Sequence, residues 1–190
     1  MKIADRIFKV FLFFALCAAF FLPGAAYAGK PAVPAASRVA VVVSDGFSMA
    51  GDVNISVESK FARLAETIVR RELRRAGFSN IAAVNLTKNQ LKLLTGGDAK
   101  SMAGLAKKQQ AQYLIYGNIT ESGADVNSFG TFSSTASVTL QIVSAATGDY
   151  VFDDMVPGKA VGGTKEEAMR KAIEKASVGI AALISGKSEY

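Results

Sequence analysis

One strand pattern, between Lys107 and Phe152, constrains the fold of this chain more than any other feature. The segment Tyr113–Thr120 is rich in aromatic and β-branched residues, and a Gly/Ser/Asn-rich turn follows it. Apolar Val138, Leu140 and Ile142 then alternate strictly with polar Ser137, Thr139 and Gln141. Such alternation predicts a strand with one buried face. A turn at residues 146–149 leads to a return strand at Tyr150–Phe152, so the segment predicts a three-stranded antiparallel meander.

The rest of the chain predicts helices that cover the apolar face of this meander. Further strands are expected at Arg38–Ser44, a continuous β-branched run typical of a strand buried on both faces, and at Asn80–Asn85. Helices are expected at Glu58–Ala76, from Thr87, at Ala99–Gln110 and from Thr164, with capping boxes at Thr87/Gln90 and Thr164/Glu167. The predicted class is α+β: an α/β sandwich with a mixed sheet and helices packed mainly on one face.

The first residues have the pattern of a secretory leader. Basic residues precede the apolar run Val10–Leu22, and Ala26-Tyr27-Ala28 is a small-x-small cleavage signal. We therefore expect a signal peptide at 1–28, a linker at 29–37, one domain at 38–185 and a polar tail at 186–190. The alternative is an uncleaved membrane anchor, although the apolar run is short for a membrane span.

The single cysteine, Cys17, lies inside the apolar run of the leader. A lipid-attachment signal needs a small residue before the cysteine, and Leu16 is not small. The sequence thus predicts an unlipidated periplasmic chain, with outer-membrane association left open. After cleavage the chain would retain 19 basic and 15 acidic residues, a net charge of +4. That charge is mild and is weak evidence for any anionic partner, and no nucleic-acid partner is predicted.

The sequence contains few of the residues and motifs that catalysis would require. The chain has no histidine, which excludes Ser-His and Cys-His arrangements. Gly46 and Gly51 have the spacing of a phosphate loop, but Asp52-Val53 replaces the required Lys-Ser/Thr pair. We expect Asp45–Ser56 to be a flexible surface loop. Asp153 and Asp154 are adjacent on a strand, so they cannot converge as an acid/base pair. We predict a non-enzyme with no catalytic residues, cofactor or metal site.

A partner contact is predicted in the turn of the meander. Ser122–Ser134 is long for a tight hairpin and carries few charges. Phe129 and Phe132 within it have no periodic reason to be buried, and exposed aromatic residues often anchor interfaces. Two interpretations stay open: the phenylalanines bind a partner, or both fold back onto the sheet edge.

A second candidate contact is a line of arginines on the helix at Glu58–Ala76. At 100° per residue, Arg63, Arg70 and Arg74 lie opposite the apolar arc, and Glu66 can pair with Arg70. This line is either a contact surface for an anionic partner or an ordinary solvated face.

Several stretches resemble a known group of bacterial envelope proteins. The segments RVAVVVSD, LKLLTGGDAKSMAGLAKKQQAQYLIYGNIT and SVTLQIVSAATGDYVF occur in the element order of that group. Together they resemble the TolB amino-terminal domain, the curli secretion protein CsgG, the middle domain of FlgT and LpoB-type activators of penicillin-binding proteins. The resemblance covers about Arg38 to Ile184.

This resemblance implies a non-enzymatic binding or assembly module of an envelope machine, either flagellar, secretory or peptidoglycan-synthesising. Its partners would be envelope proteins, with no nucleic acid and no membrane span after leader cleavage. The alternative that it implies is a CsgG-like pore subunit with Ala124–Ala136 as a membrane hairpin. Only Val126, Phe129 and Phe132 are large apolar residues there, which is few for a lipid-facing surface.

Overall fold

A computed structural model describes residues 31–49, 52–56, 59–82, 84, 86–95 and 98–186. Six strands form one sheet. Five of them have the order β2-β1-β4-β5-β6, and β3 pairs with the start of β1, on the same edge of β1 as β2. β1 is parallel to β3 and β4, and the other pairs are antiparallel. The strands are β1 (Val39–Met49), β2 (Asp52–Ser56), β3 (Ile81–Ala82), β4 (Tyr113–Val126), β5 (Phe132–Ser144) and β6 (Tyr150–Gly162).

The predicted meander is confirmed. β4, β5 and β6 pair in order, with Leu140 opposite Gly117 on one side and Asp154 on the other. Val138, Leu140 and Ile142 are fully buried, whereas the polar residues between them are partly exposed. The period-2 pattern therefore identified the inner face of the sheet correctly.

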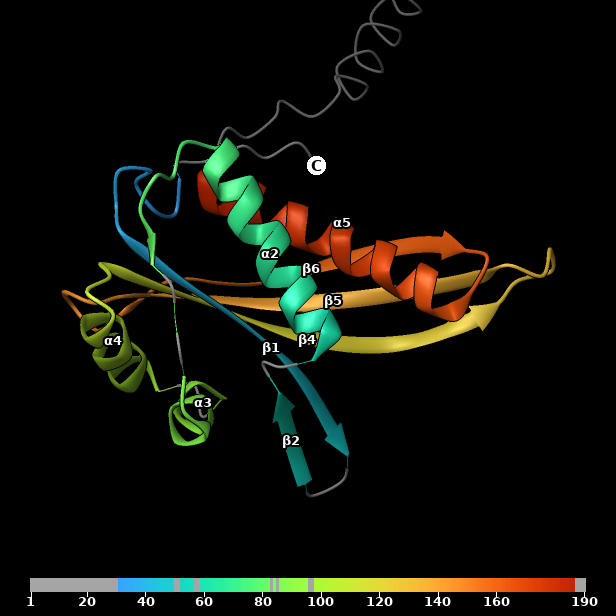
Figure 1. Cartoon of the computed structure of the whole chain (residues 1–190), viewed down its shortest axis with the longest axis horizontal. Helices are drawn as coiled ribbons and strands as arrows, with labels where there is room; N and C mark the ends of the chain where they lie inside the picture. The colour runs from blue at the N-terminus through green and yellow to red at the C-terminus, as the bar shows by residue number, and fades with distance from the viewer. Residues whose placement is uncertain are drawn as a thin grey trace, which may run out of the picture.

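The helices lie on both faces of the sheet. The two longer ones, α2 (Lys60–Arg75) and α5 (Lys165–Ser185), cover one face and enclose the larger core. The shorter α3 (Lys88–Thr95) and α4 (Ala99–Lys108) cover one end of the opposite face and enclose a smaller core (Figure 1). The α+β class is confirmed. We call the face beneath α2 and α5 the helix-covered face.

β1 is buried on both sides because it lies between these two cores. Val39, Val41 and Val43 belong to the larger core, and Ala40 and Val42 belong to the smaller one. The continuous β-branched run predicted this position.

The helix ends follow their sequence signals. Gly77, at φ 101°, follows α2, and the Phe78 amide donates to the Leu73 carbonyl at 3.0 Å, as in a Schellman motif. The Thr87 amide donates to Gln90 Oε1 at 2.8 Å ahead of α3.

Two predictions about connecting segments were wrong. Asp45–Ser56 contains a hairpin, because β1 continues to Met49 and pairs antiparallel with β2. The predicted linker contributes to the fold as well, since Val33 is fully buried in the larger core. The leader and the tail lie outside the described residues, except for Gly186, which caps α5.

Candidate functional site

The tip of the β4–β5 hairpin is a short, well-bonded turn. The predicted loop at Ser122–Ser134 was wrong, because pairing continues to Val126 and Phe132 and leaves only five residues between the strands. Asn127 organises the turn: its Oδ1 accepts from the amides of Phe129 at 3.0 Å and Thr131 at 3.1 Å. Gly130 has φ 72°, a left-handed conformation that glycine adopts without strain.

This turn presents Phe129 to solvent. The side chain of Phe129 is 88% exposed, and its backbone is held by the Asn127 carboxamide. A large aromatic side chain on a fixed backbone needs little ordering when a partner binds. The hairpin extends beyond the helices at one end of the sheet (Figure 1).

The two predicted phenylalanines differ in environment. Phe132 is the first residue of β5, pairs with Val126 and Gly162, and is half-buried. It shares a face with Ser134, whose hydroxyl lies 3.6 Å from Met169 Sδ. Phe132 and Val126 therefore lie on the helix-covered face, and Val126 is 63% exposed there. Sequence reasoning missed Val126 as part of this apolar end.

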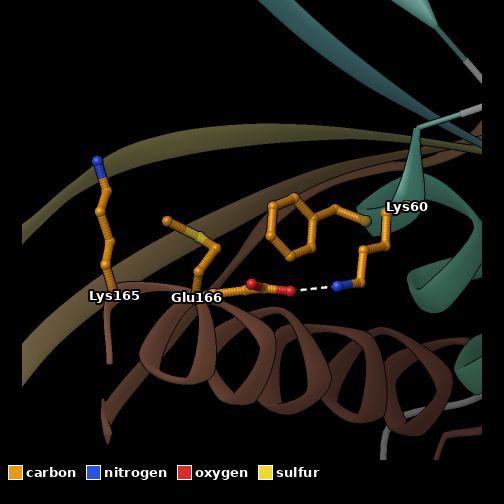
Figure 2. Close-up of a pocket in the computed structure, with 5 residues that line it drawn as sticks. Lys60, Lys165 and Glu166 are labelled. Atoms are coloured by element: carbon orange, nitrogen blue, oxygen red, sulfur yellow. Dashed lines mark hydrogen bonds and ion pairs between the residues drawn. The ribbon is translucent and has the colours of Figure 1, made fainter. Parts of the chain in front are cut away.

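A pocket of about 410 Å³ opens between the first turns of α2 and α5. Phe61 and Met169 supply its apolar wall, and Lys60, Lys165 and Glu166 supply charged groups (Figure 2). Met169 is only 2% exposed and belongs to the larger core, so the wall of the pocket there is the surface of that core. The volume lies within the range of small-molecule sites.

An ion pair joins the two helices at this pocket. Lys60 Nζ donates to Glu166 Oε1, while the Lys165 ammonium points away from the pair (Figure 2). The hydrogen bond from Lys60, assisted by its charge, lowers the pKa of Glu166. Both side chains are largely exposed, so the pair contributes little to the stability of the fold.

Two glycines of β6 set the position of α5. A Cβ at Gly158 would lie 2.0 Å from the Ala172 carbonyl oxygen, and one at Gly162 would lie 2.6 Å from the Ala168 nitrogen. The helix backbone therefore contacts the strand directly and lies over β6. The two glycines lie four residues apart on one face of the strand. This spacing in the sequence could have indicated the close approach of a helix to that face.

The three arginines of the predicted line have different environments in the structure: Arg70 is partly buried, and the other two are exposed. Arg70 Nη2 donates to the Val41 carbonyl at 3.1 Å and lies 2.9 Å from Glu66 Oε1, which confirms the predicted Glu66–Arg70 pair. Val41 lies between the segments of β1 that pair with β3 and β2, so Arg70 closes this gap in the sheet edge. Arg70 is structural, whereas Arg63 and Arg74 are exposed on α2.

Glu72 lies near the apolar side of α2, and two arginines on the same helix balance its charge. Its Oε1 accepts from Arg71 Nε at 2.8 Å and from Arg75 Nη1 at 2.9 Å. Burial alone would raise the pKa of Glu72, but the hydrogen bonds and charges of the two arginines outweigh it and lower the pKa. The cluster stabilises the end of α2 and is not part of a site.

A buried polar cluster on the opposite face is also structural. Ser44 Oγ lies 2.7 Å from the Tyr116 hydroxyl and donates to Asn118 Oδ1 at 3.0 Å. Burial raises the pKa of Tyr116, and the bond to Ser44 partly offsets this. Because these groups satisfy one another, they hold β1 to β4 and leave no group directed at a ligand.

The weaker sequence motifs do not form sites. The described part of the Gly46-to-Gly51 segment, up to Met49, is the end of β1, which pairs antiparallel with β2 and does not lead into a helix as a phosphate loop would. Asp153 and Asp154 are both exposed, and Asp154 Oδ1 accepts from the Met155 amide. Among the described residues, no three acidic, cysteine or histidine side chains converge as metal ligands. No described helix combines the length and apolarity that a bilayer span requires.

Comparison with known proteins identifies the family. The model for the C-terminal domain of TP0693-like lipoproteins matches residues 52–185. The chain belongs to this family. A comparison with curated proteins finds no match.

Solved structures share the fold at low sequence identity. The hypothetical protein CT253 from Chlamydia trachomatis is 8% identical with a TM-score of 0.55, covering 78% of this chain and 98% of that chain. A PelC dodecamer from Paraburkholderia phytofirmans is 17% identical with a TM-score of 0.51, covering 84% and 92%. The LpoB C-terminal domain from Salmonella enterica is 20% identical, covering 70% and 86%, but its TM-score of 0.37 is too low to carry an argument.

These comparisons confirm the predicted resemblance only at a coarser level. They support the fold of envelope lipoproteins, and they do not show the narrower TolB- or CsgG-like assignment. The family is described as one of lipoproteins, in which a cysteine carries the lipid, and Cys17 is the chain's only cysteine. It follows Leu16 and lies outside the described residues. The expected absence of a lipid therefore stays a prediction.

Proposed function

We propose that this chain is a non-enzymatic binding module that docks a protein partner in the bacterial envelope, with the β4–β5 hairpin tip as its contact. The observation that carries the proposal is Phe129, an aromatic side chain 88% exposed on a turn fixed by hydrogen bonds. Burial of a phenylalanine at an interface contributes substantially to affinity, and the fixed turn limits the entropic cost.

The surroundings of Phe129 support a protein partner. Val126, which is 63% exposed, and half-buried Phe132 lie at the end of the same hairpin, on the helix-covered face. Exposed apolar residues that gather at one place on a surface mark interaction sites more often than scattered ones do. Arg63 and Arg74 remain the exposed members of the predicted basic line, and they are secondary candidates for the same partner.

The setting of the proposal comes from the family. Proteins described as lipoproteins belong to the cell envelope, and the leader pattern at 1–28 agrees with export. The PelC structure is described as a dodecamer, so at least one protein of this fold forms an assembly. The absence of histidine from the whole chain favours a binding role over catalysis.

The test is site-specific photocrosslinking in cells. A benzophenone amino acid at position 129 is expected to give a discrete adduct with an envelope protein. The same probe at exposed Thr147, in the opposite β5–β6 turn, should give none. Identical adducts at both positions, or no adduct at 129, would contradict the proposal. Adducts with lipid alone would favour the alternative in which Ala124–Ala136 enters a membrane.

Phe129→Ser provides the matched functional variant. Because the side chain is almost fully exposed, the thermal midpoint should stay unchanged while partner co-purification is lost. Phe132→Ser is unsuitable for this purpose, since it removes a half-buried group and should lower stability. Unchanged co-purification by Phe129→Ser would show that the tip is not the contact.

A further inference from the structure

Two stretches of the chain carry most of its positive charge, the helix α2 and the segment at residues 84–112, and the basic residues of the second are all lysines. Residues 84–112 contain no acidic residue except Asp98, and they contain Lys88, Lys92, Lys100, Lys107 and Lys108. The resulting net charge of +4 equals that expected for the whole chain after leader cleavage. This segment folds as α3 and α4 on the face opposite α2 and α5 (Figure 1).

The lysines of α4 face solvent together. Lys100, Lys107 and Lys108 are exposed, and helical spacing places them within one arc opposite the buried Met102 and Leu105. Within the described part of the chain, none of the three lysines forms an ion pair. Their charge is therefore available to an external anion.

Asp98, the one acidic group of the segment, forms no ion pair with the described lysines of α4 and attracts Lys100 only weakly. Asp98 caps α4, and its carboxylate accepts from the amides of Ser101 at 2.9 Å and Lys100 at 3.4 Å. Hydrogen bonds from Ser101 chiefly lower the pKa of Asp98, so it stays ionised and directed at the helix end.

The placement of Lys100 is not explained by helix stability. It lies in the first turn of α4, where the macrodipole favours acidic residues, and that turn contains none. Leu93 on α3 adds an apolar side chain that is 48% exposed within the same basic segment. Lysines near an anionic bilayer surface are attracted to it electrostatically, and an exposed leucine on the same segment can add an apolar contact.

From these observations we infer that the α3–α4 face binds the surface of a lipid bilayer with anionic headgroups. Residues 84–112 contain no Phe, Tyr or Trp, and Tyr150 of β6, which is 39% exposed and contacts Met102 of α4, offers one exposed ring where single-stranded nucleic acid sites typically use several. Lysine ammonium groups attract lipid phosphate without requiring a fixed geometry. The face lies at the opposite end of the sheet from the hairpin tip, so one molecule can bind lipid and a protein partner together (Figure 1).

The experiment is vesicle co-sedimentation of the purified mature chain, residues 29–190. Phosphatidylcholine vesicles with phosphatidylglycerol should bind it, whereas phosphatidylcholine alone should not. Binding should disappear in ~1 M salt, where the Debye length is about 3 Å. Replacement of Lys100, Lys107 and Lys108 by Gln should weaken binding about 100-fold, since each lysine near an anionic surface contributes about five-fold.

The matched control replaces Lys159, Lys165 and Lys175 by Gln. These exposed lysines lie on β6 and α5, and the control has the same net charge as the α4 variant. Retained binding by the control and loss by the α4 variant support the inference, with circular dichroism confirming that both are folded. Equal loss in both variants would show an effect of bulk charge and overturn it. So would an absence of binding, or equal binding to both kinds of vesicle.

Discussion

The buried position of Leu140 leads to a quantitative test of the sheet. Leu140 is 1% exposed on the helix-covered face of β5. Its cross-strand neighbours are Gly117, which has no side chain, and exposed Asp154 at the sheet edge. Neither neighbour can fill the space left by Leu140→Ala. We therefore expect a cost in the upper part of the usual range for such truncations, about 3–4 kcal/mol.

The assay is urea unfolding of Leu140→Ala beside Thr139→Ala. With a slope of about 2 kcal/mol/M, the Leu140 variant should lose about 1.5–2 M in its midpoint. Thr139 faces the other side and is partly exposed, so its variant should lose less than about 1 kcal/mol. Equal midpoints for the two variants would refute the assigned inner face.

Three further predictions test other parts of the chain. Gly158→Ala should lower the free energy of unfolding in urea by about 3 kcal/mol or more, because the new Cβ would meet the backbone of α5. Gly163→Ala should leave that free energy nearly unchanged, because its Cβ would lie 3.5 Å from the flexible Glu167 carboxylate. Equal losses in the two variants would refute the close approach of α5 to β6. Because the folded pKa of Glu72 is lowered, its contribution to stability should be present at neutral pH and lost as pH falls below the ordinary value of 4.5. Glu72→Gln should therefore destabilise at pH 7 and less at low pH, and a constant difference would contradict this. Intact mass of the exported chain should show cleavage after Ala28 without lipid, and a retained leader or lipid adduct on Cys17 would disprove it.

Much of the fold was predictable because local patterns and tertiary packing agree. The alternation around Leu140 identified the inner face, and the run at Val39–Val43 identified the doubly buried strand. Capping signals at Thr87 and Thr164 marked helix starts, as their hydrogen bonds confirm. These features depend on short-range chemistry, which the sequence displays directly.

The errors occurred where pairing partners are distant or composition is misleading. Gly, Ser and Asn in the meander turn suggested an irregular loop, but pairing with β5 extends β4 to Val126. Arg70 looked solvated by helical spacing, yet the β1 edge offers it a free carbonyl. The pocket beside Phe61 and Met169 depends on how α2 and α5 approach each other over the sheet, which spacing along one helix cannot show.

The two proposed surfaces depend on different layers of the molecule, and this makes them separately testable. The hairpin tip is continuous with the β4–β5–β6 sheet beneath α5, whereas the lysine face depends on the smaller core beneath α3 and α4. Substitutions that are far apart and share no contacts have additive effects. Phe129→Ser should thus leave vesicle binding unchanged, and the α4 glutamine variant should keep its crosslink at position 129. If either change affected both readouts, lipid and partner binding would use one surface, and the division of roles between the two ends of the sheet would be wrong.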